Sequence, residues 1–314
     1  MSNYKIDIQE EEIKNNYPKV LKILLKDRTT RKNIKWATND YKNLGPLFDA
    51  RAEIKITLIT GPYSKLIQPR SVKIKESQIN RTKEKAEVFT PSWVCNEQNN
   101  LVDESWFGRT NIFNFTSDEK WKTINERISF PINKTWKQYI DDTRMEITCG
   151  EAPYLTSRYD TVTGKFIKTK NRIGLLDRKL QIVNENTETE EEWNKWVKRA
   201  YQNVYAYEYQ GDNLLIAREN LFYTFIENKR LKFNKTPSLK ELSEIALIIS
   251  WNIWQMDGLT YDNPMDAHEA CYCQLTLFDT MEVEEYKIDE KQLCKIKDWK
   301  SNKSITFKSL LERV

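Results

Sequence analysis

The sequence predicts an α/β fold in which helices cover both faces of a sheet, preceded by an N-terminal α+β extension. The first observation is a set of three apolar segments that each carry an acidic residue: M-E-I-T-C-G-E-A-P-Y-L (145–155), N-V-Y-A-Y-E-Y (203–209) and W-N-I-W-Q-M-D-G-L (251–259). The second is the order helix, strand, helix, helix, strand over residues 188–257. This alternation is typical of a parallel sheet whose faces are covered by helices.

The composition is that of a globular protein. The chain has 314 residues, enough for one large domain or two, and its ten Trp and fifteen Tyr supply large side chains for a core. No apolar run approaches the ~18 residues that indicate a membrane span. Residues 1–12 are polar and acidic, so no signal peptide is expected. Five cysteines without framework spacing favour a reducing cytoplasm.

Charge excludes some functions and leaves others open. The net charge of +4 is too small to establish nucleic-acid binding, but uneven charge permits a local basic face. The basic stretches 27–35 and 81–85 are candidates for phosphate contacts, and the alternative for both is solvated surface. Since His268 is the single histidine, a Ser-His-Asp triad or a His-rich metal site would depend on that one residue.

The predicted N-terminal extension spans residues 1–85. Helical spacing of apolar residues predicts a helix over 6–26, with acids early and lysines late. The alternation in E-I-K-I-T-L-I-T (53–60) predicts a half-buried strand that Gly61 and Pro62 end.

Residues 86–314 form the predicted second domain. Thr90 is expected to be the N-cap of a helix with Pro91 at its first position. Residues 107–135 read as an irregular insertion, and 157–187 as a second insertion that contains a hairpin around Thr163 and Gly164. The remaining predicted elements are helices at 188–202, 212–228 and 238–249, the last with a Ser238/Glu241 capping box, and two short strands around 301–303 followed by a few helical residues.

The three strand ends suggest a nucleoside site, because ligands of open α/β sheets bind beyond the carboxyl ends of the strands. Glu208 can accept two hydrogen bonds from a ribose diol, and Asp257 can accept one from an exocyclic amine. Gly150 allows the backbone to approach a ligand. Glu146 either orients that turn or faces the amino group of the ligand. For Glu208 and Asp257 alike, the alternative is a strand-end acid that caps the following helix.

These segments also resemble a known family. The order F-T-P, E-x-x-C-G, Y-x-Y-E-Y followed by L-L-I-A-R-E-N-L, and N-I-x-x-x-D-G-L is similar to the S-adenosylmethionine motifs of DNA adenine-N6 methyltransferases. The closest resemblance is to the modification subunits and fused enzymes of restriction–modification systems, over residues 86–260. It implies a Rossmann-like sheet, S-adenosylmethionine as cofactor, and DNA as partner, with a restriction or specificity subunit or a second methyltransferase chain as a further partner.

The resemblance implies roles for individual residues. Phe89, Thr90 and Pro91 look like the segment that holds the methionine end of the cofactor. Glu146, Thr148, Cys149 and Gly150 look like the D-P-A-C-G-S-G loop, with Glu in place of Asp. Glu208 matches the acid that binds the ribose, and Asp257 matches the residue that reads the adenine amine.

The catalytic motif of that family, [DNS]-P-P-[YF], is not found in the sequence. Asn263 and Pro264 are the only weak candidates, and the residues after them favour a turn. Two hypotheses follow: a DNA adenine-N6 methyltransferase that acts on flipped-out bases, or a cofactor- or DNA-binding subunit that needs a partner chain for methyl transfer. A methyltransferase for another acceptor is a third reading.

Two further groups of residues have less specific interpretations. His268, Cys271, Cys273 and Cys294 suggest zinc ligands, but C-Y-C is tighter than the usual spacing, and unlinked thiols are the plainer interpretation, so no metal is predicted. Trp106, Trp121 and Trp136 are able to stack on bases, although tryptophans in so Trp-rich a chain more often belong to the core.

Overall fold

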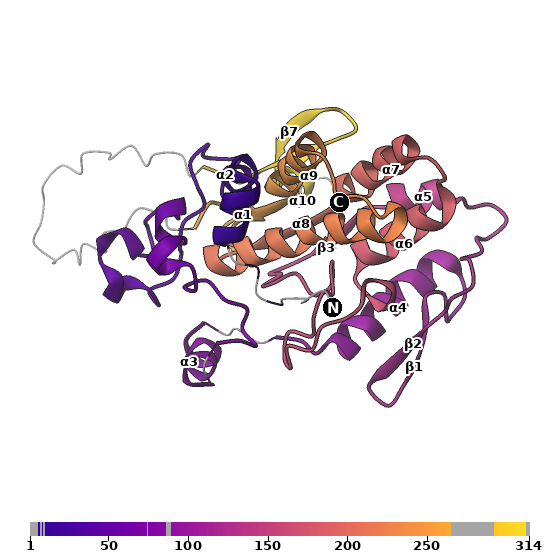
Figure 1. The fold of residues 1–314 in the computed structure, drawn as a ribbon, viewed down its shortest axis with the longest axis horizontal. Helices are drawn as coiled ribbons and strands as arrows, with labels where there is room; N and C mark the ends of the chain where they lie inside the picture. The colour runs from indigo at the N-terminus through magenta and orange to yellow at the C-terminus, as the bar shows by residue number, and fades with distance from the viewer. Residues whose placement is uncertain are drawn as a thin grey trace, which may run out of the picture.

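The computed structural model describes residues 6, 8, 10–73, 75–85, 89–264 and 292–311, and every structural statement below concerns these residues. The fold is mixed α/β, and the long helix α8 (Gly211–Phe233) crosses its middle (Figure 1). No helix among the described residues is long and apolar enough to cross a membrane. His268, Cys271 and Cys273 lie outside the described residues.

A parallel three-stranded sheet lies at the centre, in the order β3-β4-β5. The strands are β3 (Arg144–Glu146), β4 (Val204–Glu208) and β5 (Ile253–Gln255). Each lies within one of the three predicted segments, except that β3 begins one residue before its segment, at Arg144. All three run parallel, with Glu146 paired to Ala206 and Ala206 to Ile253. The predicted parallel sheet is therefore confirmed for these strands.

Helices connect the strands. The pair α6 (Leu175–Asn186) and α7 (Glu190–Gln202) leads from β3 to β4, and α8 with α9 (Leu239–Asn252) leads from β4 to β5. The helices α7 to α9 confirm the predicted ones, and the capping box at Ser238 and Glu241 is present. Helix α6 lies where an insertion was expected. Its pattern is hidden because Arg178 and Lys179 are fully buried in it, so the inward face does not read as apolar.

The prediction that helices cover both faces of the sheet is wrong for the described residues. Val204, Ala206 and Ile253 belong to the main core, which the helices build. On the opposite face, Tyr207 and Trp254 pack with side chains of the C-terminal hairpin β6 (Lys295–Asp298) and β7 (Lys303–Thr306), including Ile296, and with Phe307 just after it. The hairpin and the short α10 (Lys308–Leu311) confirm the predicted tail.

The N-terminal part contains helices and isolated bridges in place of the expected α+β arrangement. The helix predicted over 6–26 is two helices, α1 (Glu10–Asn16) and α2 (Pro18–Leu24), because Pro18 lacks an N–H and starts the second. The strand predicted over 53–60 is wrong. Only Glu53 forms a bridge, and Ile56–Leu58 is the 3₁₀ turn η3.

Short elements complete the N-terminal part: η1 (Lys42–Leu44), η2 (Pro46–Phe48), η4 (Gly61–Tyr63) and α3 (Lys75–Lys85). The main core contains side chains from both predicted domains, for example Leu21 and Leu221. The two sequence ranges therefore share one packed interior.

Helix α4 (Ser92–Phe107) begins one residue later than predicted. Its N-cap is Pro91, and Thr90 does not cap it. The first N–H of the helix, that of Ser92, instead donates to the Asp160 carboxylate at 2.7 Å. Thr90 was expected to cap the helix because it is adjacent in sequence, but Asp160, 68 residues after Ser92 in the chain, accepts this hydrogen bond.

The expected irregular insertion over 107–135 contains a hairpin of β1 (Asn114–Ser117) and β2 (Lys120–Thr123), which projects beyond α4 (Figure 1). It is followed by α5 (Trp136–Asp141), which a Thr135/Gln138 capping box starts. The hairpin predicted around Gly164 is present, with Tyr159 bridged to Phe166 and Gly164 in the left-handed region at φ 71°. The turn η5 (Thr169–Asn171) ends this loop.

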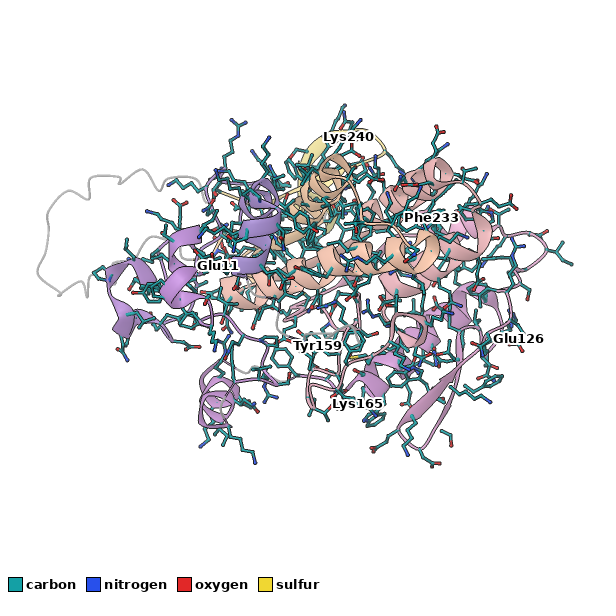
Figure 2. All side chains as sticks on the ribbon, in the orientation of Figure 1. Glu11, Glu126, Tyr159, Lys165, Phe233 and Lys240 are labelled. Carbon is teal, nitrogen blue, oxygen red and sulfur yellow. The ribbon has the colours of Figure 1, made fainter. Side chains whose placement is uncertain are left out.

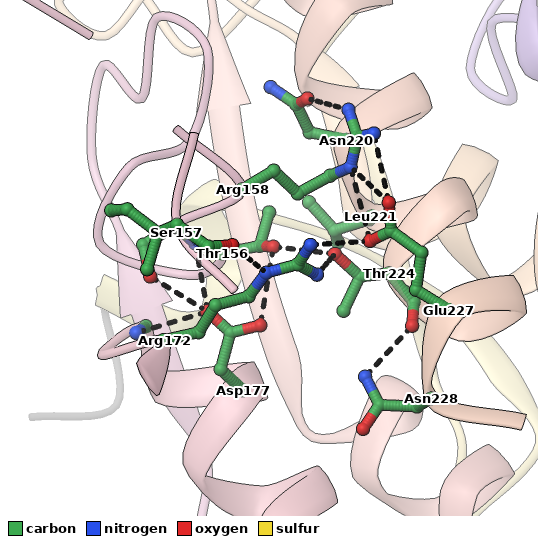
Figure 3. A network of polar contacts seen from close by, with 12 residues as sticks. Thr156, Ser157, Arg158, Arg172, Asp177, Asn220, Leu221, Thr224, Glu227 and Asn228 are labelled. Carbon is green, nitrogen blue, oxygen red and sulfur yellow. Dashed lines mark hydrogen bonds and ion pairs between the residues drawn. The ribbon is translucent and has the colours of Figure 1, made fainter. Parts of the chain in front are cut away.

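A buried polar network holds the loop of residues 158–172 against α8 (Figure 3). Arg158 and Arg172, at its two ends, both pair with Glu227, at 3.0 and 2.6 Å. Burial raises the pKa of Glu227, but the charges of Arg158 and Arg172 outweigh it and hold that pKa below its ordinary value. Because Glu227 pairs with arginines at both ends of the loop, the two ends are held in fixed positions against α8.

Arg218 joins the N-terminal part to the sheet. Its side chain is fully buried in α8 and donates to backbone carbonyls alone among the described partners. The acceptors are Ile253 in β5 at 2.8 Å, Lys26 at 3.1 Å, Leu24 at the end of α2, and Ser250 in α9 at 3.4 Å. One side chain therefore satisfies carbonyls from three elements.

Replacing Arg218 with Met should lower the free energy of unfolding by about 3 kcal/mol or more, because several buried carbonyls lose their donor. Chemical denaturation measures this. Arg230→Met is the matched control, since Arg230 is exposed on the last turns of the same helix, and it should cost less than about 1 kcal/mol. Equal losses for the two variants would contradict the assigned role.

Candidate functional site

A cavity of about 670 Å³ opens beyond the carboxyl ends of β3 and β4. This volume is in the range of roughly 300–1,000 Å³ that is typical of small-molecule sites. Seven of the residues predicted to bind a cofactor line it: Phe89, Thr90, Glu146, Thr148, Cys149, Gly150 and Glu208. Four other predicted residues are not part of its lining: Pro91, Asp257, Asn263 and Pro264.

The loop after β3 has an unusual backbone. Thr148, Gly150 and Ala152 all have positive φ, at 45°, 54° and 61°. For a β-branched residue such as Thr148 this conformation is an outlier, and such strain persists only where the surroundings hold it. The N–H of Cys149 donates to the Tyr207 carbonyl at 2.9 Å, which fixes the loop to β4. The Ala152 N–H donates to the Cys149 carbonyl at 2.7 Å, which closes the turn on itself.

Glu208 joins the loops that follow two neighbouring strands. One carboxylate oxygen accepts from the Gly150 N–H at 2.8 Å, and the other accepts from the Gln210 N–H at 3.1 Å. The side chain is 7% exposed, and it lines the cavity. The end of β4 therefore sets the position of the turn after β3.

Glu146 lies beneath the same loop. Its carboxyl oxygens accept from the N–H groups of Tyr154 at 3.3 Å and Leu155 at 3.0 Å, so it orients the chain that leaves the turn. Burial raises the pKa of Glu146 to about 8, and the charge of Glu208 adds to that rise. Burial also raises the pKa of the Cys149 thiol well above its ordinary value, so this thiol stays protonated and is a poor nucleophile.

Phe89 packs its ring on the glycine of the loop. A Cβ at Gly150 would lie 3.4 Å from the Phe89 ring, and the positive φ there also favours glycine. The guanidinium of Arg70 lies 5.3 Å from the centre of the same ring. The segment before α4 and the turn after β3 thus form one wall of the cavity.

Sequence reasoning missed two other walls. Thr38 and Asn39 of the N-terminal part line the cavity, as do Gln210 and Asn213 at the start of α8. The N-terminal segment reaches this position because Gly211 donates its N–H to the Trp36 carbonyl at 2.9 Å. The only sequence signal was Gly211 itself, where a Cβ would lie 1.9 Å from the Lys35 carbonyl oxygen.

Arg81, in one of the two basic stretches, has an internal role. It lies 2.7 Å from Asp212 at the start of α8 and 2.8 Å from Asp40, with a side chain only 3% exposed. Burial raises the pKa of Asp212, but Arg81 and Lys73 outweigh it and hold that pKa far below its ordinary value. Arg81 is therefore removed from the surface that was proposed to contact phosphates, while Arg31 and Lys32 of the other stretch are exposed.

The other predicted residues lie apart from the cavity. Asp257 accepts from the N–H groups of Leu259 at 2.8 Å and Thr260 at 3.3 Å, which closes a turn after β5. Asn263 is buried, and the Pro264 carbonyl accepts from Lys35 Nζ at 3.4 Å. Cys294 is also buried. Among the described residues, no group of three His, Cys, Asp or Glu side chains is placed to hold a metal ion.

The pKa of Glu146 makes a prediction about stability. Because that pKa is about 8 in the folded protein and 4.5 ordinarily, the folded state is favoured most below pH 4.5 and loses this contribution as the pH rises through 8. Glu146→Gln removes the titration. Its free energy of unfolding should change less than that of the wild type between pH 5 and pH 8.

Denaturant titrations across this range provide the measurement. Glu97→Gln, at an exposed glutamate of α4, is the control and should keep the pH dependence of the wild type. If Glu146→Gln has the same pH dependence as the wild type, Glu146 is not protonated in the folded protein.

No protein-family model, no curated protein and no solved structure matches this chain. The function has to be inferred from the cavity, from the residues that line it and from the order of the sequence motifs.

Proposed function

We propose that the cavity beyond β3 and β4 binds S-adenosylmethionine, and that the protein is a DNA adenine-N6 methyltransferase-like protein of a restriction–modification system. The observation that carries this proposal is the contact between Glu208 and the Gly150 N–H. It joins an acid at the end of one parallel strand to a glycine turn at the end of its neighbour, at the edge where ligands of α/β sheets bind.

The cavity supplies the groups that such a cofactor needs. Glu208 is an acceptor for the ribose hydroxyls, and the turn at Cys149 and Gly150 brings backbone close to the ligand. Phe89 and Thr90 line the same cavity, and the resemblance assigns them to the methionine end of the cofactor. The sulfonium of the cofactor supplies an activated methyl group, so the contribution of the protein is to hold the acceptor amine in line with it.

A second candidate is a cofactor-binding subunit that completes its active site with a partner chain. Two observations favour it. The sequence contains no [DNS]-P-P-[YF] motif, and Asn263 and Pro264 lie away from the cavity lining. In addition, β3 is an edge strand that pairs only with β4 among the described strands.

Under either candidate, the proposed partner of the protein is DNA, alone or together with a restriction, specificity or second methyltransferase chain. The proposed location of the protein is the cytoplasm. The exposed basic residues Arg31 and Lys32 remain available for phosphate contacts.

Titration calorimetry with S-adenosylmethionine tests the proposal. Glu208→Gln should weaken binding by roughly 10-fold to 100-fold, because a charged acceptor of the ribose hydroxyls is lost. Asp257→Asn is the matched comparison and should have a smaller effect, since its carboxylate binds a turn outside the cavity. A larger loss with Asp257→Asn would mean that the adenine ring reaches the end of β5.

A methyl-transfer assay on adenine-containing DNA separates the two candidates. Binding together with transfer by the protein alone supports the methyltransferase. Binding without transfer supports the incomplete subunit, and absence of S-adenosylmethionine binding contradicts both.

A further inference from the structure

A second hollow, of about 770 Å³, lies between the β1–β2 hairpin, the start of α4 and the loop of residues 160–168. We call it the hairpin groove. None of the residues predicted to bind a cofactor lines it. Figure 2 shows Lys165 of this loop at the edge of the molecule opposite Lys240 of α9. The groove is therefore distinct from the cavity described above.

Three half-buried aromatic side chains line the hairpin groove: Trp93, Trp121 and Phe166. They come from the first turn of α4, from β2 and from the loop. The indole of Trp121 is held in place, because its N–H donates to the Asn171 carbonyl at 2.8 Å. The Arg172 guanidinium lies 5.8 Å from the centre of the Phe166 ring. The rings of Trp121 and Phe166 are thus held at the wall of the groove, and none of the three aromatic side chains is part of either buried core cluster.

Lysines surround the rings. Lys120, Lys122, Lys165 and Lys168 line the groove, are exposed, and form no ion pair within the described part of the chain. The two acids of the lining are Glu119 and Asp160. Asp160 is engaged internally, since its carboxylate accepts from the N–H groups of Ser92 and Thr163, each at 2.7 Å. The groove therefore presents an excess of positive charge to a ligand.

The base of the groove is rigid. Arg158 and Arg172 fix the loop to Glu227 of α8 (Figure 3), and the Ile167 N–H donates to the Arg158 carbonyl at 2.9 Å. On the other side, the hairpin is tied to α4, because the side-chain amides of Asn96 and Asn114 exchange two hydrogen bonds of 2.9 Å. Both walls are held before a ligand arrives, which lowers the entropy lost on binding.

We infer that the hairpin groove binds single-stranded nucleic acid. Aromatic rings that accept stacked bases, set among lysines that contact phosphates, form the combination that sequence-tolerant single-strand binding uses. An acidic peptide would use the lysines but would gain little from fixed rings. The inference does not depend on S-adenosylmethionine binding, because the groove shares no lining residue with that cavity.

The test is fluorescence anisotropy of a fluorescein-labelled oligothymidylate with the full chain, without S-adenosylmethionine, over a series of salt concentrations. The double variant Lys120→Glu/Lys168→Glu should weaken binding at least tenfold. It should also reduce the slope of log K against log salt by about 1.4, since each lost phosphate contact removes about 0.7.

The matched control is Lys19→Glu/Lys240→Glu, which changes the net charge equally. Both lysines are exposed in the first turns of α2 and α9, where an acid is compatible with the helix dipole. This variant should bind within about twofold of the wild type at moderate salt, because its sites are distant from the groove. An equal loss in both double variants would show that only net charge matters and would overturn the inference.

Stacking is tested at Trp121. Trp121→Ala should weaken binding by about fivefold or more, and Trp121→Phe should retain most of the affinity because it keeps a ring. If Trp121→Ala and Trp121→Phe weaken binding equally while thermal melting is unchanged, the ring does not stack on a base.

Competition with polyglutamate provides the remaining outcome. If polyglutamate displaces the oligonucleotide at equal charge concentration, the groove is a general polyanion site and the inference is overturned. If the wild-type protein does not bind the oligothymidylate, the inference is also overturned. Glu208→Gln should bind the oligothymidylate as the wild type does, because Glu208 lines the other cavity, so this test is independent of the cofactor proposal.

Discussion

The buried guanidinium of Arg218 is the interaction on which the arrangement of the molecule depends. A fully buried cation is expensive to place in a helix, and burial lowers the pKa of Arg218 to about 9. The structure retains it because it satisfies carbonyls at the ends of α2 and α9 and in β5. The N-terminal part is thereby fixed against the sheet, and its residues Thr38 and Asn39 become a wall of the cavity.

Two buried carboxyl groups line that cavity and have similar surroundings. Glu146 and Glu208 are both 7% exposed, and each accepts two backbone N–H groups. Burial raises the pKa of Glu146 to about 8. Each holds a different part of the strained turn that contains Thr148. Neither this turn nor the protonated Cys149 offers a strong nucleophile. The methyl donor proposed for this cavity is compatible with such a site, because its transfer needs little acid–base assistance.

The elements that could be predicted from the sequence are those whose signals are local. The capping box at Ser238, the acids in the first turn of α7 and the strand ends at Glu146 and Glu208 need only a few neighbouring residues to be recognised. The failures involve distant partners. The interior face of α6 contains Arg178 and Lys179, which are matched by Asp103 and by the carbonyls of Tyr139 and Ile140.

The same reason explains the cavity. Seven of its lining residues belong to local motifs and were identified from the sequence, but Asn39 and Asn213 reach it through contacts between segments far apart in the chain. The second face of the sheet was also assigned wrongly, because Trp254 packs beside Phe307 and no spacing in either segment encodes that pairing. Packing between segments so far apart in the chain becomes visible only in the folded structure.

The first turn of α4 connects the two proposed sites. Thr90 lines the cavity proposed to bind the cofactor, and Trp93, three residues later, lines the hairpin groove. Asp160 fixes this turn from the groove side through the Ser92 N–H, and the hydroxyl of Thr161 donates to the Thr90 carbonyl at 3.0 Å. Through Phe89, whose ring packs on Gly150, the same segment also contacts the glycine turn, so one fixed stretch of backbone borders both proposed sites.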